Sequence, residues 1–122
     1  MIYDTGALLA AERGDRRMWL LHRRALERGV TPIVPTAVLV EAWRGGAQLA
    51  RLLAGTESEP LDEPSARRAG VLHGRAGEGP SAVDAVVAEC ALRRGEPVVT
   101  SDRADLTRLA AAEGRRLSVI DV

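Results

Sequence analysis

The amino-acid sequence predicts an α/β fold: a three-layer sandwich in which helices flank a mainly parallel central sheet of four or five strands. Short apolar runs rich in Val and Ile alternate along the chain with longer segments in which apolar residues recur every three or four positions. Glycines and prolines separate these segments, as expected where strands and helices end. Such an alternation favours a parallel sheet covered by helices. A chain of 122 residues is large enough for one core, so we expect a single domain over residues 1–122.

The first half of the chain is expected to contain two strands separated by helices. Residues 1–4 are predicted to form a strand, and residues 5–11 a helix that ends near Gly14. Residues 15–28 have the amphipathic pattern of a helix that stops at Gly29, and residues 30–34 are predicted to form the second strand. A further helix starts at Pro35 and runs to residues 44–46, with Glu41 in its middle, and residues 47–54 continue helically.

The second half is expected to repeat this alternation. Residues 57–62 are predicted to form a short edge strand, because Pro60 argues against a central position. A helix over residues 64–74 is followed by a flexible loop over residues 74–80, which contains three glycines and a proline. Helices are predicted over residues 81–94 and 102–114, and strands over residues 97–101 and 117–122.

The composition limits the function classes. The formal net charge is zero, so the field of the whole molecule does not favour nucleic acid, and any such binding must come from local patches. The chain has no Lys, which excludes lysine-dependent chemistry, and its only aromatic residues are Tyr3, Trp19 and Trp43, too few for a base-stacking platform. No apolar run reaches the roughly 18 residues of a membrane span. With no basic leader at the start of the chain, we expect a cytoplasmic protein.

Four carboxylates lie inside or directly after apolar runs, where buried side chains are expected: Asp4, Glu41, Asp84 and Asp102. Asp4 and Asp102 follow predicted strands, whereas Glu41 and Asp84 lie on predicted helices that are expected to begin at the same edge of the sheet. Because open parallel sheets gather ligands at the carboxyl ends of their strands, all four are expected to converge at one edge.

Converging carboxylates repel one another unless divalent cations neutralise them. Since Cys90 is the only cysteine, a thiolate cluster is excluded and the ligands must be oxygens, which favours Mg²⁺, with Mn²⁺ as a substitute. Such a site suits phosphodiester hydrolysis, in which one or two ions activate water and stabilise the leaving oxygen. Thr100 and Ser101, directly before Asp102, are candidates to orient a water or a phosphate oxygen.

Each acid also has a purely structural explanation. Asp4 is placed to cap the helix that follows it, and Asp84 can form a capping box with Ser81. Asp102 can cap the next helix, with Asp105 three residues later. Glu41 has no capping role, and Arg44 is the nearest candidate for an ion pair.

Other reactive residues have simpler interpretations. Cys90 is expected to be a small core residue, and neither His22 nor His73 has a neighbouring ligand in the sequence. The arginines of residues 13–28 form either a solvated helix face or a contact surface for RNA phosphates.

Four segments in order resemble the PIN domain family, and within it the VapC-type ribonuclease toxins of toxin–antitoxin pairs. They are the Ile-Tyr-Asp-Thr-Gly-Ala-Leu-Leu segment at Asp4, Pro-Thr-Ala-Val-Leu-Val-Glu ending at Glu41, Asp-Ala-Val-Val-Ala-Glu-Cys-Ala from Asp84, and Val-Val-Thr-Ser-Asp-Arg-Ala-Asp-Leu around Asp102. The resemblance implies that Asp4, Glu41, Asp84 and Asp102 bind Mg²⁺, with Thr100 and Ser101 in the polar position before the last acid and Asp105 as an auxiliary acid.

The resemblance also implies cleavage of single-stranded RNA, a homodimer, and a small cognate antitoxin that places a basic side chain near the acids. The chain departs from many relatives in the short interval between Glu41 and Asp84, which includes the glycine-rich loop. In relatives the helices of this interval commonly form the antitoxin groove and the dimer surface.

Two other classes of protein compete with this interpretation. A phosphoaspartyl domain, either a receiver or a phosphatase of the haloacid dehalogenase type, also places Asp at strand ends, but the absence of Lys argues against both, and the phosphatase needs an acid where this chain has Gly6. The other alternative is a degenerate PIN-like binding module that retains its acids only as caps and ion pairs.

Overall fold

The computed structural model describes all residues from Met1 to Val122 and contains one five-stranded sheet. The strands are β1 (Ile2–Tyr3), β2 (Ile33–Pro35), β3 (Glu57–Glu59), β4 (Val98–Thr100) and β5 (Val119–Asp121). They lie in the order β3-β2-β1-β4-β5, and every neighbouring pair is parallel. The predicted mainly parallel sheet is therefore confirmed, and β1 is its central strand.

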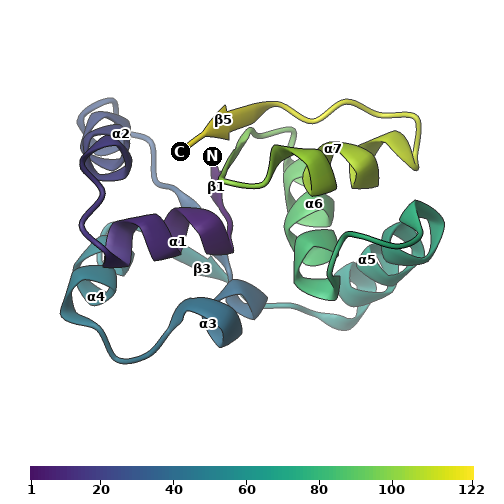
Figure 1. The fold of residues 1–122 in the computed structure, drawn as a ribbon, viewed down its shortest axis with the longest axis horizontal. Helices are drawn as coiled ribbons and strands as arrows, with labels where there is room; N and C mark the ends of the chain where they lie inside the picture. The colour runs from purple at the N-terminus through teal and green to yellow at the C-terminus, as the bar shows by residue number, and fades with distance from the viewer.

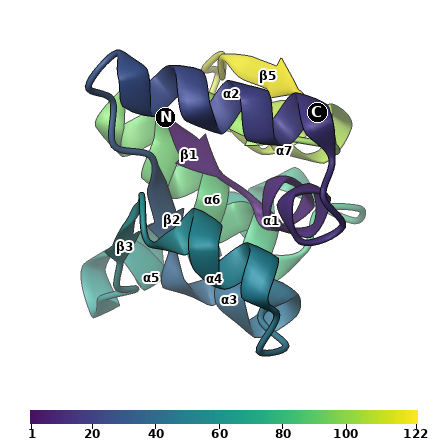
Figure 2. The same cartoon turned by 90° about the vertical axis from the view of Figure 1, so that its left-hand side faces the viewer.

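Seven helices cover the sheet. They are α1 (Thr5–Glu12), α2 (Arg16–Glu27), α3 (Thr36–Ala42), α4 (Ala47–Leu53), α5 (Glu63–Ala76), α6 (Ala82–Arg94) and α7 (Arg103–Ala111). From β1 the chain moves outward to β2 and β3, and it then returns to the other side of β1 for β4 and β5. Because crossovers are right-handed, this reversal places α1–α4 on one face and α5–α7 on the other (Figures 1 and 2). The predicted three-layer sandwich is confirmed.

The core lies around the three inner strands. Every residue of β1, β2 and β4 is buried, whereas β3 and β5 are exposed or half-buried, as expected of edge strands. One cluster of 26 buried residues spans both faces of the sheet. Small side chains such as Ala7, Ala11, Ala85 and Ala88 form much of the buried surface of α1 and α6. These two helices begin with Asp4 and Asp84 close by, so their packing positions both acids.

Several predicted boundaries are wrong, including the ends of the strand at residues 57–59 and of the helix at residues 103–111, and three others bear on the site or the sheet. The helix that carries Glu41 ends at Ala42, because Trp43 has an extended backbone (ψ 122°), so Glu41 is its penultimate residue and not in its middle. Helix α5 continues through Gly74 to Ala76, and the loop starts only at Gly77, whose φ of +76° stops the helix. The second strand covers residues 33–35 and not 30–34.

No helix of the structure combines the length and the apolar character needed to cross a bilayer.

Candidate metal centre

The candidate site lies where the strand order reverses. Strands β1 and β4 are neighbours, with Tyr3 opposite Val99, and the Asp4 amide donates to the Val99 carbonyl at 3.2 Å. The helices that follow these two strands lie on opposite faces of the sheet (Figure 1). Such a reversal leaves a crevice beyond the carboxyl ends of the strands, where parallel α/β proteins bind their ligands. Asp4 and Asp102 follow β1 and β4 directly at this point.

Three carboxylates come close enough to share one ion. One oxygen each of Asp84, Asp102 and Asp105 lies within 4.8 Å of the other two. Partial burial raises the pKa of Asp105. The charge of Asp102 and its hydrogen bond with Asp105 raise this pKa further, as does the charge of Asp84. The three groups therefore repel one another as ions, which is the condition that a bound cation relieves.

Asp4 is the buried member of the site, with 5% of its surface exposed. Burial, assisted by the charge of Asp84, raises its pKa to about 6, although hydrogen bonds from the Thr100 hydroxyl and the Ala7 amide oppose this shift. Asp4 is therefore close enough for its pKa to respond to the charge of Asp84. No arginine contributes to this shift, so Asp4 has no cationic partner within the chain.

Glu41 differs from its predicted setting. It is exposed and not buried, because α3 ends one residue later and its polar end faces solvent. Its Oε1 accepts a hydrogen bond of 2.7 Å from Thr5, the residue after Asp4. The expected partner Arg44 instead donates to the carbonyls of Val40 and Trp43. Glu41 is thus linked to the site by Thr5 and has no ion pair.

The capping explanation accounts for two of the acids and not for a third. The Asp4 Oδ1 accepts from the Ala7 amide at 2.9 Å, and Asp84 forms a capping box with Ser81, whose two hydrogen bonds measure 2.9 and 3.0 Å. Asp102 precedes α7 but its side chain caps no amide. Each cap engages one carboxylate oxygen, so capping and metal binding are compatible for Asp4 and Asp84.

The two hydroxyl residues before Asp102 have different environments. Thr100 is buried, and its Oγ1 accepts a hydrogen bond from the Asp102 amide at 2.8 Å. Its hydroxyl also acts on Asp4, whose pKa it lowers. Thr100 therefore connects the acid after β1 to the acid after β4. Ser101 is exposed and lies against α1.

Gly6 is a site residue that sequence reasoning missed. A Cβ at this position would lie 2.1 Å from the Ser101 Oγ and 3.0 Å from its backbone nitrogen, so only glycine lets α1 approach the end of β4. The available signal was a glycine in a first helical turn, where its low helix propensity calls for a reason.

The donor set fits a hard divalent cation, because it consists of carboxylate oxygens alone. The other classes of ligand are occupied elsewhere. Cys90 is buried in α6, and burial raises the pKa of its thiol to about 12. One nitrogen of His22 is bonded to the Tyr3 hydroxyl at 2.9 Å, and one of His73 to the Pro80 carbonyl at 3.0 Å.

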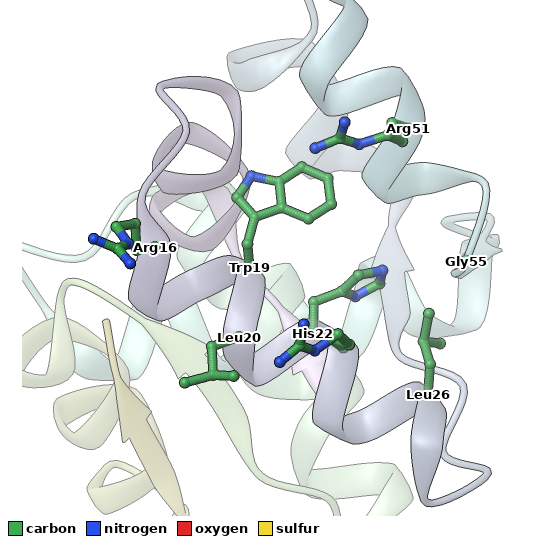
Figure 3. Close-up of a pocket in the computed structure, with 8 residues that line it drawn as sticks. Arg16, Trp19, Leu20, His22, Leu26, Arg51 and Gly55 are labelled. Atoms are coloured by element: carbon green, nitrogen blue, oxygen red, sulfur yellow. The ribbon is translucent and has the colours of Figure 1, made fainter.

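A hollow of about 660 Å³ lies elsewhere, between α2 and α4 (Figure 3). Its lining includes Arg16, Trp19, His22 and Arg51 and contains no carboxylate, and the Arg51 guanidinium stacks 4.4 Å from the centre of the Trp19 ring. The acids therefore do not belong to this hollow.

Two comparisons with known proteins agree with this geometry. The family model described as PIN domain matches residues 1–112. A chain in the crystal structure of VapBC2 from Rickettsia felis bound to a DNA fragment from their promoter is similar with a TM-score of 0.72 and 17% sequence identity, over 100% of this chain and 99% of that one. No curated protein matches the sequence. At this identity the structural likeness shows the fold.

Proposed function

The chain belongs to the PIN domain family, and from this premise we propose that it is a Mg²⁺-dependent endoribonuclease that hydrolyses RNA phosphodiester bonds, with Mn²⁺ able to replace Mg²⁺. Proteins of this family are generally nucleases. The observation that carries the proposal is the convergence of Asp84, Asp102 and Asp105 beside the buried Asp4 at the carboxyl ends of β1 and β4.

Each acid has a role in this proposal. Asp84, Asp102 and Asp105 are the principal metal ligands, and Asp4 completes the site from its buried side. A divalent cation bound there would supply an activated water and positive charge for the phosphoryl oxygens. Glu41, exposed and oriented by Thr5, is the carboxylate available to position the attacking water and accept its proton.

Thr100 and Ser101 act in support. Thr100 interacts with both Asp4 and the backbone amide of Asp102, and so fixes their relative position. Ser101 presents an exposed hydroxyl at the same edge of the sheet.

We further propose that the protein is the toxin of a toxin–antitoxin pair and is held inactive by a small cognate antitoxin. The likeness to a chain of the VapBC2 complex supports this role through the shared fold. The open position of the acids, two of which are exposed, suits a polymeric substrate such as single-stranded RNA. The homodimer stays a prediction from the family resemblance.

A degenerate binding module is the alternative function. Structural capping explains why such a module would keep Asp4 and Asp84. It does not explain Asp102, which caps nothing and forms no ion pair. This difference favours the enzyme.

The proposal is tested by incubating the protein with labelled single-stranded RNA in Mg²⁺, in Mn²⁺ and in EDTA. We expect internal cleavage with either metal and none in EDTA. The Asp102→Asn variant is expected to fold like the parent and to be inactive under all three conditions. Equal cleavage by this variant and the parent would show that a contaminating nuclease is responsible and would overturn the assignment.

A further inference from the structure

One basic side chain lies at the metal centre without a partner. Arg108 follows Asp105 by one helical turn in α7, and its exposed guanidinium has no carboxylate within 4.0 Å and donates no hydrogen bond within the chain. Its guanidinium and the Asp105 carboxylate both lie against Gly79, so its charge lies beside the site.

The glycine-rich loop lies against this guanidinium. A Cβ on Gly79 would lie 2.7 Å from Nη1 of Arg108 and 3.4 Å from Oδ1 of Asp105, and a Cβ on Gly77 would lie 3.9 Å from Nη2 of Arg108. Both glycines have a positive φ, +76° at Gly77 and +114° at Gly79, which residues with a side chain rarely adopt. The loop thus leaves the space that Arg108 fills, and residues between Glu41 and Asp84 take part in the site.

The loop is anchored by hydrogen bonds at its end, but two of its backbone amides have no hydrogen-bond partner. His73 bonds the Pro80 carbonyl at 3.0 Å, and Ser81 begins the capping box that holds Asp84. In contrast, the amides of Glu78 and Gly79 donate no hydrogen bond within the chain. Free amides and a free guanidinium therefore lie side by side next to the metal ligands.

Several other arginines are already engaged in ion pairs. Arg68 and Arg93 pair with Glu89, Arg93 and Arg94 pair with Glu59, and Arg103 pairs with Asp121 at 2.6 Å. Arg108 differs because it forms no ion pair and lies one turn after Asp105, one of the three acids expected to bind the cation. Once a cation neutralises them, the charge of Arg108 is left uncompensated. A guanidinium in that position suits a phosphate, which it can bind through two parallel hydrogen bonds.

We propose that Arg108 and the backbone of residues 77–79 form a phosphate-binding subsite, which holds a phosphate of the RNA next to the one that is cleaved. This inference rests on the proposed ribonuclease function and states how the same site holds its substrate.

The test measures RNA affinity apart from cleavage. In a Glu41→Gln background with Mg²⁺, chosen to stop cleavage, the anisotropy of a fluorescent single-stranded RNA gives the dissociation constant over a range of NaCl concentrations. Arg108→Gln is compared with Arg116→Gln, which removes the same charge from an exposed arginine beyond the other end of α7. Circular dichroism melting verifies that both variants fold.

We expect Arg108→Gln to weaken binding about tenfold and to reduce the salt slope by about 0.7, the value for one phosphate contact of a single strand. Arg116→Gln is expected to change the affinity less than about twofold. Arg108→Lys should keep the salt slope but lose part of the affinity, because an ammonium group lacks the planar fork.

Equal affinities for the Arg108→Gln and Arg116→Gln variants would overturn the subsite. So would unchanged RNA affinity of Arg108→Gln together with tighter Mn²⁺ binding by titration calorimetry, because Arg108 would then act only as a counter-ion. The two proposals fail separately. RNA binding that depends on Arg108 without cleavage by the parent protein contradicts the nuclease alone, whereas cleavage with unchanged affinity of the variant contradicts the subsite alone.

Discussion

The inner and outer halves of the metal centre are built differently. The inner half consists of Asp4 and Thr100, both buried at the ends of the central strands and both used by the fold, since Asp4 caps α1 and Thr100 bonds the backbone of Asp102. The outer half contains Glu41 and Asp102, which are exposed and serve neither a cap nor an ion pair. A residue of the inner half therefore affects stability and activity together, whereas Asp102 is expected to affect activity alone.

The largest effect is expected from Asp102→Asn in the outer half. Cleavage should fall at least about 100-fold, because loss of a direct ligand should exceed the 10- to 100-fold effect typical of its supporting contacts. The free energy of unfolding in EDTA should change by less than about 0.5 kcal/mol, as for other surface substitutions. Initial rates and urea denaturation check the two expectations. A large loss of stability would place Asp102 with the inner half.

Asp4→Asn should lower the rate of cleavage and raise the free energy of unfolding. The fold raises the pKa of Asp4 from 3.8 to about 6, so the metal-free protein loses stability as the pH rises from about 4 to 6 and the loss persists above that range. Asparagine carries no charge and can still accept from the Ala7 amide. At pH 7 we expect the variant to be inactive but more stable by about 2–3 kcal/mol in EDTA.

The pH dependence serves as the control for this prediction. At pH 4 Asp4 is protonated in the native protein, and the difference in stability between variant and parent should largely disappear. Urea denaturation at pH 4, 5.5 and 7 measures the trend. A variant that is less stable at every pH would show that the carboxylate acts mainly as the cap of α1.

Gly6→Ala tests the close approach of α1 to β4. The added methyl group meets Ser101, including its backbone, and should lower the free energy of unfolding by about 1–3 kcal/mol, as overpacking does. Gly70→Ala is a matched control, since nothing lies within 4 Å of a Cβ at this position in α5. It should stabilise the protein by up to about 1 kcal/mol through helix propensity. Thermal melting compares the two, and equal shifts would contradict the steric account.

The smallest effect is expected from Thr5→Val, which removes the hydroxyl that orients Glu41. Cleavage should fall several-fold with little change in metal affinity, because Glu41 is outside the group of three close carboxylates. Single-turnover rates and Mn²⁺ titration separate these quantities. A marked loss of metal affinity would instead make Glu41 a ligand that Thr5 positions.

The sequence predicted a mainly parallel sheet with Asp4 and Asp102 at one edge, because both follow apolar strand runs and parallel sheets collect such residues there, but it did not predict the strand order. It did not predict the exposure of Glu41, which depends on the extended backbone at Trp43 that ends α3. Asp105 was assigned an auxiliary role, since its distance from Asp84 is set by the packing of α6 against α7 and not by local pattern. The contact between Gly6 and Ser101 likewise joins distant segments.

Calorimetric titration of Mn²⁺ into the protein at pH 7 tests most directly whether these acids form a metal centre. The account predicts that the parent protein binds Mn²⁺, and that Asp102→Asn loses this binding while keeping its fold and its melting temperature in EDTA. Absence of binding by the parent protein, or equal binding by the parent and the variant, would contradict it.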